Sequence, residues 1–107
     1  MAQLYGIIAT HEPATCPQAN PKVREAVGAD FPRLGEVLTQ HAVSMLSAEH
    51  FDPEHLFVFR VEADSIEAVR DFVNTARLPQ WNNCRIYPLT PLPELVEHLA
   101  SLPPPIL

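Results

Sequence analysis

Apolar residues recur along the chain at two spacings, which predict four strands and three helical regions. Strands are predicted at residues 4–10, 42–48, 56–63 and 83–89, where apolar or β-branched residues run together or alternate. The stretch 56–63 has the clearest pattern of the four. Its side chains would alternate across a sheet, one set being Phe57, Phe59 and Val61 and the opposite set Leu56, Val58, Arg60 and Glu62.

Helical spacing predicts a broken helix between the first and second strands. Asn20 is expected to cap its first piece, because it directly precedes Pro21 and Pro fits the first turn of a helix. Gly28 would end that piece, and Asp30 would cap a second one. The segment that ends at Asn20, residues 11–20, has no periodicity and is expected to be a long loop.

Two further helices are predicted in the second half of the chain. Asp64 and Glu67 have the spacing of a capping box ahead of a helix that ends before residue 79. Thr90 would cap a terminal helix that begins at Pro91. The apolar stripe of that helix is expected to pack against the molecule and consists of Leu92, Leu95, Val96 and Leu99.

The order of these segments is strand, helix, strand, strand, helix, strand and terminal helix. This is the split βαβ pattern of ferredoxin-like α+β domains, with the two crossovers on one face of a four-stranded antiparallel sheet. We expect a single domain over residues 1–107, with a core at about 3–99 and a proline-rich tail at 100–107. Asp52 and Pro53 predict the turn between the second and third strands.

Composition narrows the range of partners and locations. The chain has 107 residues, with 13 acidic and 7 basic side chains and a formal charge of −6. Without clustered Lys or Arg, we expect neither nucleic acid nor an anionic membrane as a partner. The N-terminal sequence lacks the pattern of a signal peptide, and two cysteines make no disulfide framework. We therefore expect a cytoplasmic protein in which Cys16 and Cys84 are free thiols.

The face of the sheet opposite the crossover helices needs a cover. Leu56 and Val58 on that face are too apolar for open water, at roughly 25 cal/mol for each Å² of apolar surface. We expect the cover to be the sheet of a second copy in a twofold homodimer. The alternative is a monomer whose terminal helix covers the sheet.

In fold pattern and in two segments, the chain resembles the dimeric α/β-barrel superfamily. The resemblance rests on the order of elements, on THEPATCP after the first strand and on PEHLFVFRVEADSIEAVRDF. Within the superfamily the chain is most similar to small bacterial domains of unassigned function. The superfamily includes cofactor-independent monooxygenases, haem-degrading enzymes, muconolactone isomerase-like proteins and ligand-binding stress proteins. The resemblance therefore implies a fold and a dimer, but no particular reaction.

The expected topology brings several polar residues to one end of the sheet. We expect the first and third strands to be parallel neighbours, which would make the second strand begin where the first one ends. The residues that would meet there are His11, Glu12, Cys16, His41, Trp81 and Asn82. His50 and His55, in the hairpin between the second and third strands, would lie at the opposite end.

Two histidines and a cysteine are ligands that zinc accepts. His11, Cys16 and His41 are therefore candidate ligands for a divalent metal such as zinc. The same residues could instead form a nucleophile and base pair, or only hold the loop in place by hydrogen bonds and packing. Arg60, on the apolar face with Glu62, would form a salt bridge or bind a polar ligand.

Three classes of function remain open from the sequence. The favoured one is a homodimer that binds a small molecule or a metal through residues drawn from His11, Glu12, Cys16, His41, Arg60, Trp81 and Asn82. The second is an enzyme without an organic cofactor, similar to the superfamily's monooxygenases or isomerases. The third is a purely structural or interaction domain. The chain has no G-x-G-x-x-G, phosphate-binding loop or C-x-x-C motif, so ATP, nicotinamide and thioredoxin chemistry are not expected.

Overall fold

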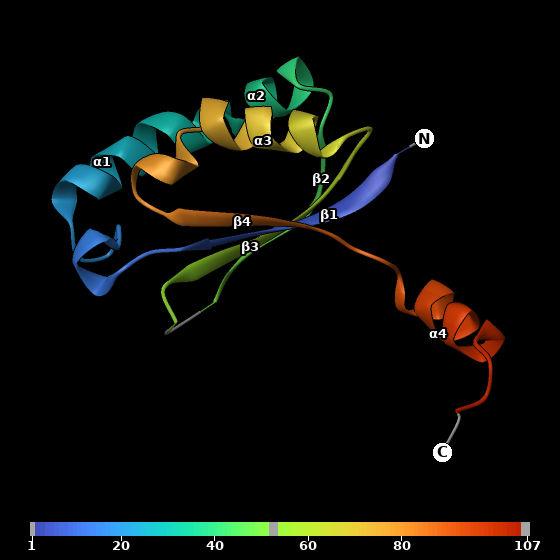
Figure 1. The fold of residues 1–107 in the computed structure, drawn as a ribbon. Coiled ribbons are helices and arrows are strands. Elements are labelled where there is room, and N and C mark those ends of the chain that lie inside the picture. Colours follow the sequence, from blue (N-terminus) through green and yellow to red (C-terminus); the bar gives the residue numbers. More distant parts are fainter. Residues whose placement is uncertain (1, 52–53, 106–107) are drawn as a thin grey trace.

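The computed structural model describes residues 2–51 and 54–105, which form one four-stranded sheet and four helices (Figure 1). The strands are β1 (Gln3–Thr10), β2 (Ser44–Phe51), β3 (Leu56–Ala63) and β4 (Asn83–Pro88). The helices are α1 (Pro21–Asp30), α2 (Leu34–Gln40), α3 (Ile66–Thr75) and α4 (Leu92–Ser101). Short 3-10 turns occur at Pro13–Thr15, Phe31–Arg33 and Leu78–Gln80. This order confirms the predicted ferredoxin-like α+β class with an extra C-terminal helix.

The turn predicted at Asp52 and Pro53 lies outside the described residues. Among the residues that are described, none of the helices combines the length and the apolar character that a membrane crossing requires.

The strands lie in the order β2-β3-β1-β4, and all three neighbouring pairs are antiparallel. The expectation of a parallel pair formed by the first and third strands is therefore wrong. β1 and β2 run in the same direction because a helical crossover joins them, and the hairpin then reverses β3. Because β3 lies between β1 and β2, it is antiparallel to both. The end of β1 consequently lies beside the β2–β3 hairpin and beside the start of β4.

The helices α1, α2 and α3 all lie on one side of the sheet (Figure 1). The core lies between the sheet and the helices α2 and α3, and α1 contributes no buried residue to it. Strand β3 alternates as predicted: Phe59 and Val61 are buried, whereas Arg60 and Glu62 are exposed on the opposite face. Helix α3 contributes Phe72, which is fully buried. The alternation along one strand thus separates a helix-covered face from an open face.

One of the predicted helix caps is confirmed, and two differ from the prediction. Asn20 caps α1 as expected, because its Oδ1 accepts hydrogen bonds from the backbone N–H groups of residues 22 and 23 at 3.0 and 3.1 Å. Gly28 does not end α1, and Asp30 makes no capping hydrogen bond, because its own backbone is still helical. Helix α3 is capped by Ser65, whose Oγ accepts from the N–H of Ala68 at 3.2 Å, in place of the expected Asp64.

Helix α4 also begins one residue later than expected and does not pack on the sheet. Its N-terminal capping residue is Pro91 in place of Thr90. The helix extends away from the open face of the sheet (Figure 1), and every residue of it is exposed. The expectation that its stripe packs within the molecule is wrong, and so is the alternative in which α4 covers its own sheet.

Core packing around α3 gives a first prediction. Replacing Phe72 by Ala removes a fully buried ring and should lower the free energy of unfolding by about 3–5 kcal/mol. Urea denaturation followed by circular dichroism measures this loss. The neighbouring Asp71→Ala variant is the control, because Asp71 is exposed and its loss should change the stability by less than ~0.5 kcal/mol. Equal losses in the two variants would contradict the description of this core.

Candidate metal centre

The antiparallel pairing of β1 with β3 brings two histidines together. Thr10 lies opposite Leu56, the first residue of β3, and both belong to the open face of the sheet. The next residues on either side are His11 and His55, whose backbones are joined by a hydrogen bond from the His11 N–H to the His55 carbonyl at 3.0 Å. Because side chains alternate, this pair belongs to the face that the helices cover.

The loop after β1 brings Cys16 to the same place. A 3-10 turn at Pro13–Thr15 reverses the chain, and the N–H of Cys16 donates to the carbonyl of Pro13 at 3.3 Å. The Cys16 carbonyl then accepts from the N–H groups of Ala19 and Asn20 at 2.9 and 2.8 Å. The loop is therefore held by backbone hydrogen bonds on both sides of Cys16, whose side chain is only 1% exposed.

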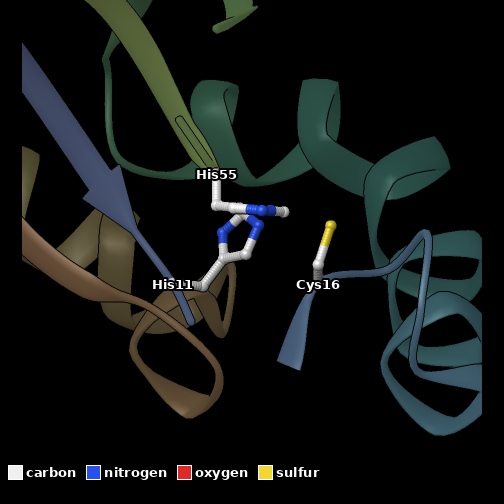
Figure 2. A group of neighbouring side chains, drawn as sticks. All are labelled: His11, Cys16 and His55. Carbon is white, nitrogen blue, oxygen red and sulfur yellow. The ribbon is translucent and has the colours of Figure 1, made fainter. Parts of the chain in front are cut away.

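Figure 2 shows His11, Cys16 and His55 converging from three segments of the chain. One ligand atom from each of them, the Sγ of Cys16 and one ring nitrogen of each histidine, lies within 4.8 Å of the other two. Zinc binds nitrogen at about 2.0–2.1 Å and sulfur at about 2.3 Å, which places the ligand atoms of a tetrahedral centre roughly 3.3–3.8 Å apart. Small side-chain movements would close the present arrangement around a metal ion.

Asn82 determines which nitrogen of His11 is available. The Asn82 side-chain Nδ2 donates to the carbonyl of Leu78 at 3.1 Å, so the Oδ1 is the atom that faces His11. His11 Nδ1 lies 3.0 Å from that oxygen and must carry the proton, because Oδ1 can only accept. His11 Nε2 then bears a lone pair. It is buried and has no hydrogen-bond partner among the described residues.

An unpaired buried acceptor is uncommon in a folded protein. Leaving such a group without a partner costs about 1–3 kcal/mol. Histidines that bind metals usually donate their other ring N–H to a protein oxygen, which fixes the tautomer and the orientation of the ring. The hydrogen bond from His11 Nδ1 to Asn82 has this form, and the free lone pair on Nε2 is the one a metal would use.

Aromatic rings surround His11. Trp81, Phe57 and His55 have ring centroids 5.3, 5.7 and 5.8 Å from that of His11, and His50 stacks on it at 6.4 Å. Burial lowers the pKa of His11 below its usual value, and charge on His55 or His50 would lower it further. The hydrogen bond to Asn82 opposes this pKa shift only in part. His11 is therefore neutral at pH 7, as a metal ligand must be.

The backbone of His55 is in the left-handed region, with φ of 53°. Such a conformation costs a residue with a side chain about 1–2 kcal/mol, although His accepts it more readily than most. The conformation lies at the residue where the hairpin turns into β3. It orients the imidazole of His55 toward His11 at the cost of local strain.

Four of the residues predicted from the sequence do meet at this end of the sheet: His11, Cys16, Trp81 and Asn82. Glu12 lies beside them and is exposed. It borders an open pocket of about 390 Å³ with His11 and Trp81. Arg60 lies elsewhere, exposed on the open face of the sheet, where it borders a separate hollow with Glu62.

His41 is not part of this cluster, so its predicted place beside His11 is wrong. It precedes β2, whose first residue Ser44 lies opposite Glu62 near the far end of β3. Roughly 24 Å of strand, about seven residue steps at 3.4 Å each, separates that end from His11. The Nε2 of His41 lies 2.9 Å from the hydroxyl oxygen of Thr75, which joins α2 to α3.

His55 and His50, which sequence reasoning placed at the opposite end, are the residues that it missed. The order of elements was enough to predict their position beside His11. A crossover makes β1 and β2 run in one direction, so the hairpin after β2 must return beside the end of β1. The sequence EHFDPEH around that hairpin already carried both histidines.

The second cysteine, Cys84 on β4, takes no part in this cluster. It is a free thiol, half-buried under α3, and burial raises its pKa to about 11. At neutral pH it stays protonated and is a poor ligand or nucleophile.

Comparisons with known proteins support the fold and nothing more specific. No family model and no curated protein matches the chain. An unknown protein from Galdieria sulphuraria aligns over 85% of this chain with a TM-score of 0.51 and 10% identity. The alignment covers 47% of that protein, so this chain spans about half its length. The 30S ribosomal protein S6 from Thermotoga maritima aligns over 94% of this chain and 100% of its own, with a TM-score of 0.49 and 12% identity.

The lowered pKa of His11 predicts how stability depends on pH. Unfolded His11 takes up a proton near its ordinary pKa of 6.5, whereas folded His11 does so only at lower pH. Protonation therefore favours the unfolded chain, and the contribution of neutral His11 is complete above pH 6.5 and lost as the pH falls below it. In metal-free protein, the free energy of unfolding should exceed that of His11→Gln by more at about pH 7.5 than at about pH 5.5. Urea denaturation of both proteins at the two pH values measures the difference, and an equal difference at both would contradict this assignment.

Proposed function

We propose that this protein binds a divalent transition metal of the zinc class through His11 Nε2, Cys16 Sγ and a ring nitrogen of His55. The observation that supports this most strongly is the buried lone pair of His11 Nε2, which has no partner among the described residues. It belongs to a group of three ligand atoms within 4.8 Å of one another. Asn82 holds the ring in the tautomer that metal binding requires.

The ligand set restricts the metal. Two imidazoles and a thiolate suit zinc or copper, and they suit magnesium or calcium poorly because those ions prefer oxygen ligands. Three protein ligands leave a fourth tetrahedral position for water or a small molecule. A thiolate ligand needs a reduced cysteine, which fits the cytoplasmic location that we also propose.

Catalysis by a His11 and Cys16 pair fits the geometry less well. Cys16 is 1% exposed, so a substrate could not reach its sulfur, and buried thiols are generally inert. Neither nitrogen of His11 is available to take a proton from a substrate, because Nδ1 is bonded to Asn82 and Nε2 is buried. Mere packing of the loop would leave that buried acceptor unpaired. Metal binding uses all three groups.

Cobalt titration of the metal-free protein tests the proposal. Co²⁺ occupies sites of the zinc type and, unlike Zn²⁺, absorbs visible light, while a thiolate ligand adds a charge-transfer band. Wild type should bind one Co²⁺ per chain and show that band. His11→Ala, Cys16→Ser and His55→Ala should each lose the tight site. His41→Ala, the matched control, should bind as wild type does, because the His41 ring bonds to Thr75 and takes no part in the cluster.

Asn82 is a positioning residue in the same experiment. Asn82→Ala should weaken Co²⁺ binding by about 10–100-fold, as loss of an outer-shell hydrogen bond typically does. Asn82→Asp keeps an oxygen that accepts from His11 Nδ1 and should restore most of the affinity. A wild-type spectrum without the thiolate band, or a His41→Ala variant that fails to bind, would refute the site.

We also propose that the chain forms a homodimer, as in the dimeric α/β-barrel superfamily it resembles. Leu56 and Val58 on the open face are only half-buried, as are Leu4 and Ile8 on β1 beside them. Burying this surface against a second copy would remove it from water. The metal site lies on the other face, so the two proposals can fail separately.

The molar mass in solution tests the homodimer. Light scattering at micromolar concentration should give about 24 kDa for wild type, twice the chain mass of 11.9 kDa. Val58→Asp should halve that mass, because pairing would bury a carboxylate without a partner. Circular dichroism checks that the variant is folded. A wild-type mass near 12 kDa would refute the homodimer.

A further inference from the structure

Helix α4 presents an apolar stripe that no other part of residues 2–51 and 54–105 covers. Every residue from Pro91 to Ser101 is exposed. Large side chains recur at spacings of three and four residues along one side of the helix, and Leu102 follows at its C-terminal end. These side chains remain 40–68% exposed: Leu92, Leu95, Val96, Leu99 and Leu102. A surface helix of this pattern normally turns such a stripe toward a core.

Residues 89–102, which follow β4 and include α4, form an arm. The first residue of this arm is fixed by hydrogen bonds to β1, so α4 leaves the sheet in a defined direction. The N–H of Leu89 donates to the carbonyl of Leu4 at 2.8 Å, and the Gln3 side chain donates to the Leu89 carbonyl at 3.2 Å. The Leu89 side chain lies over Gly6, where an added Cβ would come within 3.2 Å of it. Thr90 then precedes Pro91, a position that disfavours helical backbone. The helix therefore begins beyond the end of β4 (Figure 1).

The chain also exposes more surface than a compact monomer of its size. Its accessible area is 7343 Å², about 1,400 Å² above the roughly 5,900 Å² expected for 11.9 kDa. Its radius of gyration is 16.7 Å, against about 13 Å for a compact chain of this length. Removing the excess from two copies would bury about 2,800 Å², which is in the range of obligate homodimers.

We propose that α4 of each protomer lies across the open sheet face of its partner, so that the dimer is formed by an exchange of arms. This inference rests on the homodimer proposed above and specifies its geometry. A second copy is the occupant that the structure favours, because one chain carries both uncovered surfaces and one twofold contact covers both. A foreign partner would have to match two separate surfaces.

The dimensions of the two surfaces agree. A helix of ten residues is about 15 Å long. Four strands about 4.8 Å apart span about 14 Å between the outer strand axes. α4 is therefore long enough to cross all four strands. Along that path it would meet the apolar side chains of the open face, among them Ile8, Leu56 and Val58.

Two variants that each add a charge to one side of α4 distinguish arm exchange from a dimer in which only the sheets are in contact. Leu99→Glu puts a carboxylate into the apolar stripe, and Ser101→Glu puts one on the opposite side of the same helix. Both variants should fold as wild type does, because α4 contributes nothing to the buried core. Light scattering at micromolar concentration should give a mass near 24 kDa for wild type and Ser101→Glu. It should give half that mass for Leu99→Glu.

If Leu99→Glu stays dimeric, arm exchange is refuted while the homodimer itself stands, held by the sheet faces. If wild type is a monomer, both the homodimer and the exchange are refuted. If Ser101→Glu dissociates as readily as Leu99→Glu, the stripe is not the contact surface and the exchange is refuted.

Discussion

The antiparallel pairing of β1 with both β3 and β4 is the constraint on which the rest of the structure depends. It sets Thr10 opposite Leu56 on one side and Asn83 on the other. The residues just beyond these positions are His11, His55 and Asn82, which are far apart in sequence and meet at one edge of the sheet. If β3 ran in the opposite direction, His55 would lie away from His11 and Asn82. The same pairing divides the sheet into a helix-covered face and an open one.

At this end of the sheet, one amide side chain determines which nitrogen of His11 carries the proton. Asn82 is oriented by its bond to the Leu78 carbonyl, so it offers only an oxygen to His11. That oxygen fixes the proton on Nδ1 and leaves a lone pair on Nε2. Burial then lowers the pKa of His11 and keeps the ring neutral. His11, with its tautomer fixed and its ring neutral, lies beside a buried thiol and a second imidazole. It therefore has the properties of a metal ligand in the metal-free protein.

Much of the fold could be predicted from the sequence because each element has its own periodic pattern. The alternation along β3 and the cap at Asn20 needed no knowledge of the rest of the chain. Strand direction is different, since no residue pattern encodes it. It follows from the crossover, and an error there placed His41 in the site and left His55 out.

Two other features could not be predicted for related reasons. Ser65 and Asp64 are adjacent residues that can both cap a helix, and only the backbone conformation selects Ser65. The spacing of apolar residues in α4 correctly predicted a helix with one apolar side. Periodicity shows that such a side needs a cover, but it does not show whether the cover belongs to the same chain.

X-ray absorption at the zinc edge of the zinc-loaded protein tests the central claim most directly, because it counts the ligands and identifies their elements. The arrangement of His11, Cys16 and His55 predicts one sulfur at about 2.3 Å and at least two imidazole nitrogens at about 2.0–2.1 Å. In Cys16→Ser the sulfur shell should disappear. A zinc ion bound by oxygen and nitrogen alone in the wild-type protein would contradict the proposed centre.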